Sequence, residues 1–93
     1  MIKIGYFADG PWSHRALQKI VQSPDLDVSF IIPRFDSEDP VLREYANTLQ
    51  VPFIIHENVN SPDFLEIVAP YSADIFVSMS FNQILKKDII DRV

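Results

Sequence analysis

Few residues of this chain have side chains that could support catalysis or bind a metal. His14 and His56 are the only histidines, and there is no cysteine. The two histidines lie on different predicted elements and match no usual spacing of zinc ligands, so we expect no metal site. Asp36, Glu38 and Asp39 form an acidic cluster. We interpret this cluster as a solvated loop, because the sequence brings no further magnesium ligands toward it.

The segment that begins at Asp9 is the first candidate for ligand binding. It reads Asp-Gly-Pro-Trp-Ser-His, and Pro11 suits the first turn of a helix. The N–H groups at such a helix start can hold an anion. Trp12 could stack on a ligand ring, and His14 could contact a ligand or transfer a proton. The structural alternative is that Asp9 only caps the helix and Gly10 only makes the turn.

Several common ligands and partners are disfavoured by motif and charge. Gly5 and Gly10 are the only glycines, so neither a dinucleotide-binding fingerprint nor a phosphate-binding loop can be formed. The net charge is −5 and the basic residues are scattered, so we expect no direct nucleic-acid binding by this segment. The chain starts without a signal-like segment and has no apolar run of about 20 residues. We therefore expect a cytoplasmic protein without a membrane partner.

Strand-like and helix-like segments alternate along the chain. We expect strands at residues 2–8, 28–32, 51–56 and 74–79, and helices at 11–22, 40–49, 62–70 and 84–93. In the last helix we expect Ile84, Leu85, Ile89 and Ile90 to face inward. The order β-α-β-α-β-α-β-α predicts one α/β domain over residues 1–93, a doubly wound open parallel sheet with strand order 3-2-1-4. In that topology the loops at residues 9–14 and 80–83 border the ligand crevice.

Two stretches resemble a known family. Residues 57–64 read ENVNSPDF and residues 72–85 read SADIFVSMSFNQIL. Together with Val51-Pro52, they resemble the N-terminal, Rossmann-like domain of the folate-dependent formyltransferases. These include methionyl-tRNA formyltransferase, the glycinamide ribonucleotide enzyme and the sugar-nucleotide N-formyltransferases of one-carbon metabolism.

The resemblance implies transfer of a formyl group from 10-formyltetrahydrofolate, acting as co-substrate, to a substrate amine, without a metal. The main chain of the turn after the fourth strand would hold the pterin, at Phe81, Asn82, Gln83, Ile84 and Leu85. The loop beside the acceptor substrate would be Asp9, Gly10, Pro11, Trp12 and Ser13. An amino sugar nucleotide is the favoured acceptor, because the acidic balance disfavours the tRNA enzyme, which stays as an alternative.

The catalytic residues of that family cannot be assigned to this sequence. Its asparagine, histidine and aspartate would follow Val93, and neither His14 nor His56 fits the role. The resemblance thus implies the front part of a longer enzyme, in which a histidine transfers a proton and an asparagine stabilises the oxyanion. We expect residues 1–93 alone to be inactive and to self-associate through the uncovered edge of strand 74–79.

A second alternative is a non-catalytic, flavodoxin-like binding or signalling module. Signalling receivers share the β-α alternation and can be acidic. They need clustered carboxylates after the first strand, where this chain has only Asp9, and an aspartate after the third, where it has His56-Glu57. A third reading is a complete but degenerate protein that binds a folate or a sugar nucleotide without turning it over.

Overall fold

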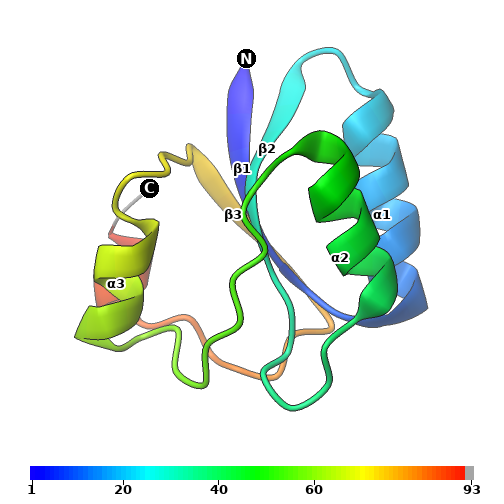
Figure 1. Cartoon of the computed structure of the whole chain (residues 1–93). Helices are drawn as coiled ribbons and strands as arrows, with labels where there is room; N and C mark the ends of the chain where they lie inside the picture. Colours follow the sequence, from blue (N-terminus) through cyan, green and yellow to red (C-terminus); the bar gives the residue numbers. More distant parts are fainter. Residues whose placement is uncertain (92–93) are drawn as a thin grey trace.

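The chain folds as an α/β structure around an open sheet of three parallel strands (Figure 1). The computed structural model describes residues 1–91. Its elements are β1 (Ile2–Ala8), α1 (Gly10–Gln22), β2 (Leu26–Ile32), α2 (Pro40–Leu49), α3 (Pro62–Val68), β3 (Ile75–Met79) and α4 (Lys87–Ile90). The strand order is β2-β1-β3, and helices cover both faces. The predicted α/β class and parallel sheet are thus confirmed.

The segment predicted as the third strand, residues 51–56, makes only one isolated parallel bridge, between Phe53 and Ile31. Ile31 N–H donates to the carbonyl of Pro52 at 2.9 Å, and Ile54 N–H donates to the carbonyl of Ile31 at 3.0 Å. Pro52 has no N–H and therefore weakens any longer ladder. The sheet has three strands in the order β2-β1-β3, not four in the order 3-2-1-4.

The starts of α2 and α3 follow the same local rule. Asp39 caps α2 by accepting from Val41 N–H at 2.9 Å and Leu42 N–H at 3.2 Å. Ser61 caps α3 by accepting from Phe64 N–H at 3.2 Å. In both cases proline follows the cap, where its missing N–H costs nothing. Both helices begin at the predicted residues, 40 and 62. Asp39 is buried, so the interpretation of the acidic cluster as a solvated loop is wrong for this residue.

The last helix is shorter than predicted. It covers Lys87–Ile90 instead of residues 84–93, of which 92 and 93 lie outside the described residues. Only Ile89 is fully buried, whereas the side chains of Ile84 and Ile90 are 80% and 48% exposed. The expectation that Ile84 and Ile90 face inward is therefore wrong.

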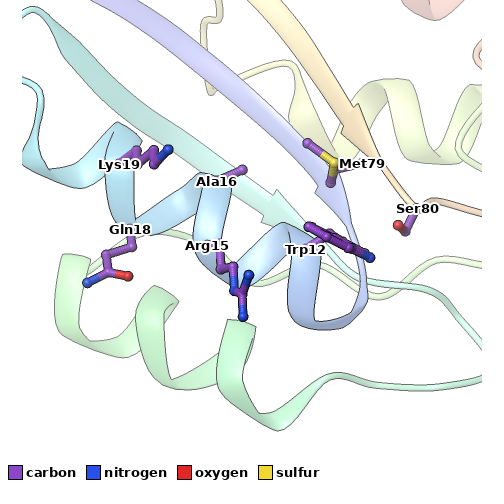
Figure 2. Close-up of a pocket in the computed structure, with 7 residues that line it drawn as sticks. All are labelled: Trp12, Arg15, Ala16, Gln18, Lys19, Met79 and Ser80. Carbon is purple, nitrogen blue, oxygen red and sulfur yellow. The ribbon is translucent and has the colours of Figure 1, made fainter.

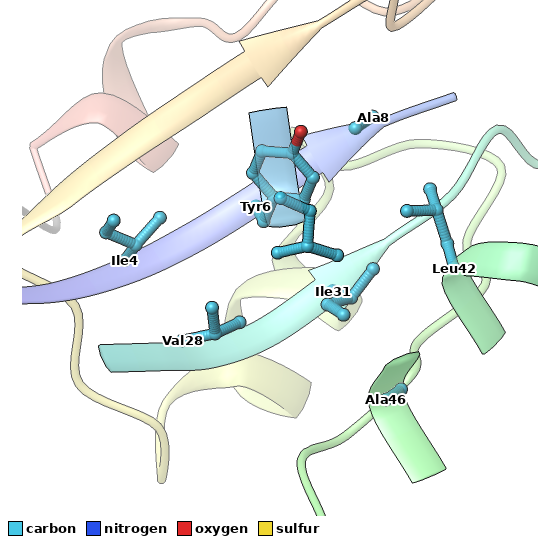
Figure 3. Packing of buried hydrophobic residues seen from close by; sticks show 8 residues of the cluster. Ile4, Tyr6, Ala8, Val28, Ile31, Leu42 and Ala46 are labelled. Atoms are coloured by element: carbon cyan, nitrogen blue, oxygen red, sulfur yellow. The ribbon is translucent and has the colours of Figure 1, made fainter. Parts of the chain in front are cut away.

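Two separate cores lie on the two faces of the sheet. The cluster toward α1 and α2, drawn in Figure 3, contains Ile4, Tyr6, Ala8, Leu17, Val28, Ile31, Leu42 and Ala46. The cluster toward α3 and α4 contains Phe7, Phe30, Ile32, Val59, Phe64, Val68 and Ile89. In β2 the register shifts, because Ile4 pairs with Val28 and Gly5 with Phe30. Ser29 is the extra residue of this bulge, so Val28 and Phe30 point to opposite faces.

The face toward α3 and α4 is aromatic and tightly packed. The Phe7 ring lies 5.9 Å from that of Phe30 and 5.2 Å from that of Phe76, both in edge contacts. A Cβ atom added to Gly5 would lie 2.6 Å from the Phe30 ring and 2.7 Å from that of Phe76. Glycine is needed at this position because the rings occupy the space above it.

β3 lies at the edge of the sheet. It pairs with β1, and none of the described residues pairs with its other side. Ile75 at its start is 44% exposed. None of the helices within residues 1–91 is both long and apolar enough to span a bilayer.

Candidate functional site

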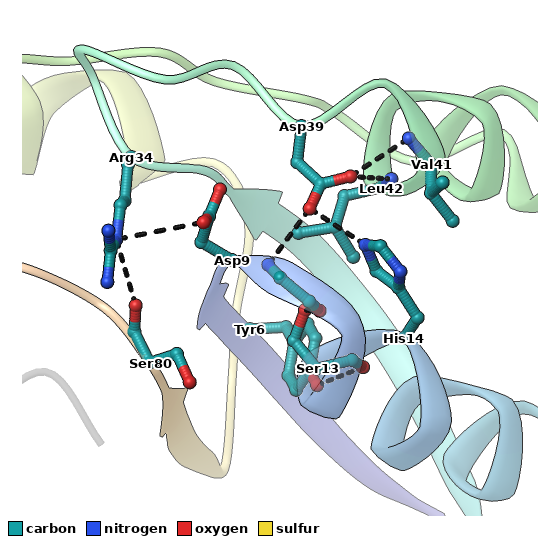
Figure 4. A network of polar contacts seen from close by, with 10 residues as sticks. Tyr6, Asp9, Ser13, His14, Arg34, Asp39, Val41, Leu42 and Ser80 are labelled. Atoms are coloured by element: carbon teal, nitrogen blue, oxygen red, sulfur yellow. Dashed lines mark hydrogen bonds and ion pairs between the residues drawn. The ribbon is translucent and has the colours of Figure 1, made fainter.

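A buried carboxylate joins the starts of two helices at the carboxyl end of the sheet (Figure 4). Besides capping α2, Asp39 accepts from Gly10 N–H, at the start of α1, at 3.0 Å. His14 Nε2 lies 2.7 Å from the same carboxylate oxygen, Oδ2. Asp9, by contrast, makes no cap contact with α1 through its side chain. Asp9 stands at the N-cap position, but the alternative in which its side chain caps the helix is wrong, because Asp39, from another part of the chain, accepts from Gly10 N–H.

The charge of Asp39 is stabilised where it lies. Burial acts to raise the pKa of Asp39, but hydrogen bonds from Gly10, His14 and Leu42 outweigh burial and lower the pKa below the ordinary 3.8. The carboxylate therefore stays charged. This arrangement gives one ring nitrogen of His14, Nε2, a structural partner in Asp39.

Two buried hydroxyl groups, those of Tyr6 and Ser13, also stabilise the first turn of α1. Tyr6 donates its hydroxyl hydrogen to the carbonyl of Ser13 at 2.7 Å, and the Ser13 hydroxyl donates to the carbonyl of Gly10 at 2.6 Å. Both side chains are fully buried. Burial raises the pKa of Tyr6 to about 12, so the phenol remains a hydrogen-bond donor at neutral pH. Gly10 has a positive φ of 84°, which favours glycine at this turn.

Arg34 connects the ends of β1 and β3. Its Nε donates to the carbonyl of Ser80 at 2.9 Å and lies 3.8 Å from the carboxylate of Asp9. Asp9 N–H in turn donates to the carbonyl of Met79 at 3.1 Å. These contacts hold the carboxyl ends of β1 and β3 side by side. The loops that follow these two ends are the ones predicted to border the ligand crevice.

Two amide side chains, those of Gln83 and Asn60, connect the loop after β3, residues 80–86, to the segment at residues 56–60. Gln83 accepts from Val59 N–H at 2.8 Å and donates to the carbonyl of His56 at 3.2 Å. Asn60 donates to the carbonyl of Ile84 at 2.7 Å and accepts from Lys86 N–H at 2.7 Å. The backbone of the loop is thus fixed without belonging to a helix or a strand.

The five predicted pterin-contact residues have unequal surroundings. Phe81 packs on Phe7 at 5.6 Å between ring centroids. Asn82 is exposed and donates to Asp36 at 3.2 Å. Gln83 and Leu85 are half-buried, and Ile84 projects outward, 80% exposed. The structure therefore shows Phe81 and Gln83 anchoring the loop, while Asn82 and Ile84 reach the surface.

A groove with a volume of about 790 Å³ lies between α1 and the end of β3 (Figure 2). Its lining residues are Trp12, Arg15, Ala16, Gln18, Lys19, Met79 and Ser80. Of the predicted acceptor-binding segment only Trp12 lines the groove, and none of residues 81–85 does. Gly10, Pro11 and Ser13 belong to α1 rather than to a loop. The groove also contains Ser80, which has a positive φ of 57°.

Sequence reasoning missed three basic residues near these loops. Arg34 comes two positions after the predicted strand at residues 28–32, which places it at the carboxyl edge of the sheet. Arg15 and Lys19 were not considered. With Trp12 they follow helical spacing, i, i+3 and i+7, which places all three on one face of α1. That spacing was the available signal.

The remaining predicted residues have structural surroundings. The ring of His56 lies 5.5 Å from that of Phe64, and its Nδ1 accepts from Asn58 N–H at 3.0 Å.

Among residues 1–91, no three potential ligands from His, Cys, Asp and Glu come together to hold a metal ion. No protein-family model matches the chain, and a search of curated proteins finds no match either. The site therefore has to be interpreted from its own residues.

Proposed function

We propose that this chain binds a formyl-carrying reduced folate, as the N-terminal domain of a folate-dependent formyltransferase does. The pterin would lie against the main chain of residues 81–85. The sequence pattern SMSFNQIL, residues 78–85, supports this family. A pterin edge presents alternating donors and acceptors, which fixed backbone N–H and C=O groups can match.

The observation that carries the proposal is the way the loop is held. The Gln83 side chain bonds to the backbone of the segment at residues 56–59, and the Asn60 side chain bonds to the backbone of the loop, at residues 84 and 86. Binding to a preformed backbone avoids the entropy cost of ordering a flexible segment. Side chains at the outer positions, such as Asn82, would then contribute little to recognition.

In the proposed reaction, the amine nitrogen of an amino sugar nucleotide attacks the formyl carbon. The bond between this carbon and the folate nitrogen breaks, and the proton lost by the amine ends on that nitrogen. The formylated amine and tetrahydrofolate are the products. Residues 1–93 contain no counterpart of the family's catalytic asparagine, histidine and aspartate, so the role proposed for them is binding of the donor.

The test is calorimetric titration with 5-formyltetrahydrofolate, a stable reduced folate. Asn82→Ala should leave the affinity within about twofold, because an exposed side chain is removed and the backbone is kept. Asn82→Pro should abolish measurable binding, since proline removes the N–H and restricts the preceding residue. Thermal melting of both variants would establish that they are folded.

Two results would contradict the proposal. One is the absence of folate binding by the unchanged chain. The other is an Asn82→Pro variant that binds as tightly as Asn82→Ala.

The methionyl-tRNA acceptor differs from the amino sugar nucleotide in its demand for cationic contacts, and the net charge of −5 favours the smaller acceptor.

The signalling alternative has less support. It would use Asp9 as a phosphate acceptor within a carboxylate cluster, whereas Asp9 lies beside Arg34 and the described residues hold no metal-binding group of acids. Incubation with acetyl phosphate followed by mass measurement would reveal phosphorylation. A mass increase of one phosphoryl group per chain, absent from the Asp9→Asn variant, would support the signalling alternative and contradict the folate proposal.

A further inference from the structure

The groove beside α1 has an unusual charge for this chain. The chain carries a net charge of −5, yet the residues that line the groove include two cations, Arg15 and Lys19, and no acid. Within residues 1–91 neither cation takes part in an ion pair. Both side chains are exposed and are therefore available to an anionic ligand.

An aromatic platform adjoins the two cations. Trp12 is 69% exposed, whereas tryptophan side chains are on average mostly buried. The guanidinium carbon of Arg15 lies 5.6 Å from the centroid of the Trp12 ring, in a cation–π arrangement. Figure 2 shows Trp12, Arg15 and Lys19 following one another along α1, with Met79 and Ser80 opposite at the end of β3.

The size of the groove narrows the class of ligand. A volume of about 790 Å³ falls within the range typical of small-molecule sites, about 300–1,000 Å³. Two cations are too few for a nucleic acid, whose affinity depends on many phosphate contacts. A ring that stacks on tryptophan and an adjacent pair of phosphates would match the platform and the two charges.

We propose that this groove binds a nucleoside diphosphate, with the base or ribose on Trp12 and the diphosphate on Arg15 and Lys19. Arginine can contact one phosphate through two parallel N–H groups, and lysine supplies a point charge one helical turn away. This inference rests on the proposed function, because it assigns the nucleotide part of the amino sugar nucleotide to this groove. It adds Arg15 and Lys19 to the acceptor site.

Trp12 is the only tryptophan, so its fluorescence reports directly on the groove. Titration with uridine diphosphate should change this fluorescence in a saturable way. The double variant Arg15→Gln, Lys19→Gln should weaken binding at least about tenfold, because two charge-assisted contacts are lost. Uridine and inorganic pyrophosphate, each tested alone, should bind at least about tenfold more weakly than the whole nucleotide.

Lys87→Gln is the matched control. It removes one positive charge from α4, which packs on the opposite face of the sheet, and should leave the affinity unchanged. The absence of a saturable fluorescence change would overturn the inference. Equal affinities for the double variant and the unchanged chain would overturn it too, as would pyrophosphate binding as tightly as uridine diphosphate.

The two proposals can fail separately. If 5-formyltetrahydrofolate binds and uridine diphosphate does not, the folate proposal stands and the groove assignment is wrong. If uridine diphosphate binds with the expected charge dependence and the folate does not, the nucleotide site stands and the folate proposal is wrong. The variants change exposed side chains, so their thermal melting should match that of the unchanged chain.

Discussion

The two faces of the sheet are held together by different kinds of interaction. Toward α3 and α4, Phe7 packs against the rings of Phe30, Phe64, Phe76 and Phe81, and the buried side chains of the cluster are all apolar. Toward α1 and α2, the carboxyl end of the sheet buries polar groups that are joined by hydrogen bonds, with Asp39 at the centre. The first face is packed by apolar side chains alone, and the second adds buried hydrogen bonds and a charge to its apolar core.

This difference matters for function because each of the two candidate binding regions adjoins a different face of the sheet. The loop at residues 81–85 leaves the aromatic face, anchored by Phe81 and Gln83. The groove beside α1 adjoins the polar face, where Asp39 positions the first turn of the helix. We therefore expect changes of side-chain volume to disturb the loop, and changes of charge or pH to disturb the start of α1.

The largest effect is expected from filling the space above Gly5. Gly5→Val should destabilise the fold by about 3 kcal/mol or more, because the added atoms would overlap the rings of Phe30 and Phe76. Gly10→Ala has free space and only a backbone cost, about 1–2 kcal/mol. Urea unfolding measures both changes. A Gly5→Val variant more stable than Gly10→Ala would refute the claim that the aromatic face is limited by volume.

Removal of the shared cap should have the next largest effect. Asp39→Ala would leave the N–H groups of Gly10, Val41 and Leu42 without their acceptor, and should cost about 2–3 kcal/mol. Asp63→Ala, in the first turn of α3, is the control, and as an exposed change it should stay within about 0.5 kcal/mol. Equal unfolding midpoints for the two variants would show that Asp39 is not a cap for two helices.

Acid should weaken the polar face. The pKa of Asp39 is lower in the folded chain than its ordinary value of 3.8, so its contribution to stability is complete above that value. The contribution is lost as the pH falls from there through the lower folded pKa. The urea midpoint of the unchanged chain should therefore fall more steeply below about pH 4 than that of Asp39→Asn. Parallel declines would contradict the assignment.

The smallest effect concerns the loop after β3. Gln83→Ala would leave the N–H of Val59, a fully buried residue, without its acceptor and should cost about 1–2 kcal/mol. Asn82→Ala should stay within about 0.5 kcal/mol, because the side chain is exposed. The comparison uses neighbouring positions and is measured by urea unfolding. If Asn82→Ala were the more damaging change, Gln83 would not be the anchor of this loop.

Local patterns in the sequence predicted much of the fold. Asp39 and Ser61 were recognisable as caps because each precedes a proline and an apolar helical face. The parallel sheet followed from the alternation of elements. The strand expected at residues 51–56 failed because Pro52 cannot donate to a ladder, and its apolar neighbours gave a signal that concealed this.

The site was less predictable because its contacts join distant residues. Asp39 lies 25 residues from His14, and Arg34 lies 46 residues from Ser80. No local pattern indicates such pairs. The same holds for Gln83, whose side chain bonds to the backbone of Val59 and His56, 24 and 27 residues earlier in the chain. Arg15 and Lys19 could have been found, because their spacing from Trp12 is local.

The bulge in β2 has a consequence for changes in chain length. Val28 and Phe30 already lie on opposite faces, with Ser29 between them as the extra residue. Loss of one residue from a regular strand turns every following side chain to the other side. Loss of Ser29 would instead leave each remaining side chain of β2 on its present side. This strand is thus a place where a protein of this kind can become one residue shorter in evolution without turning its interior outward.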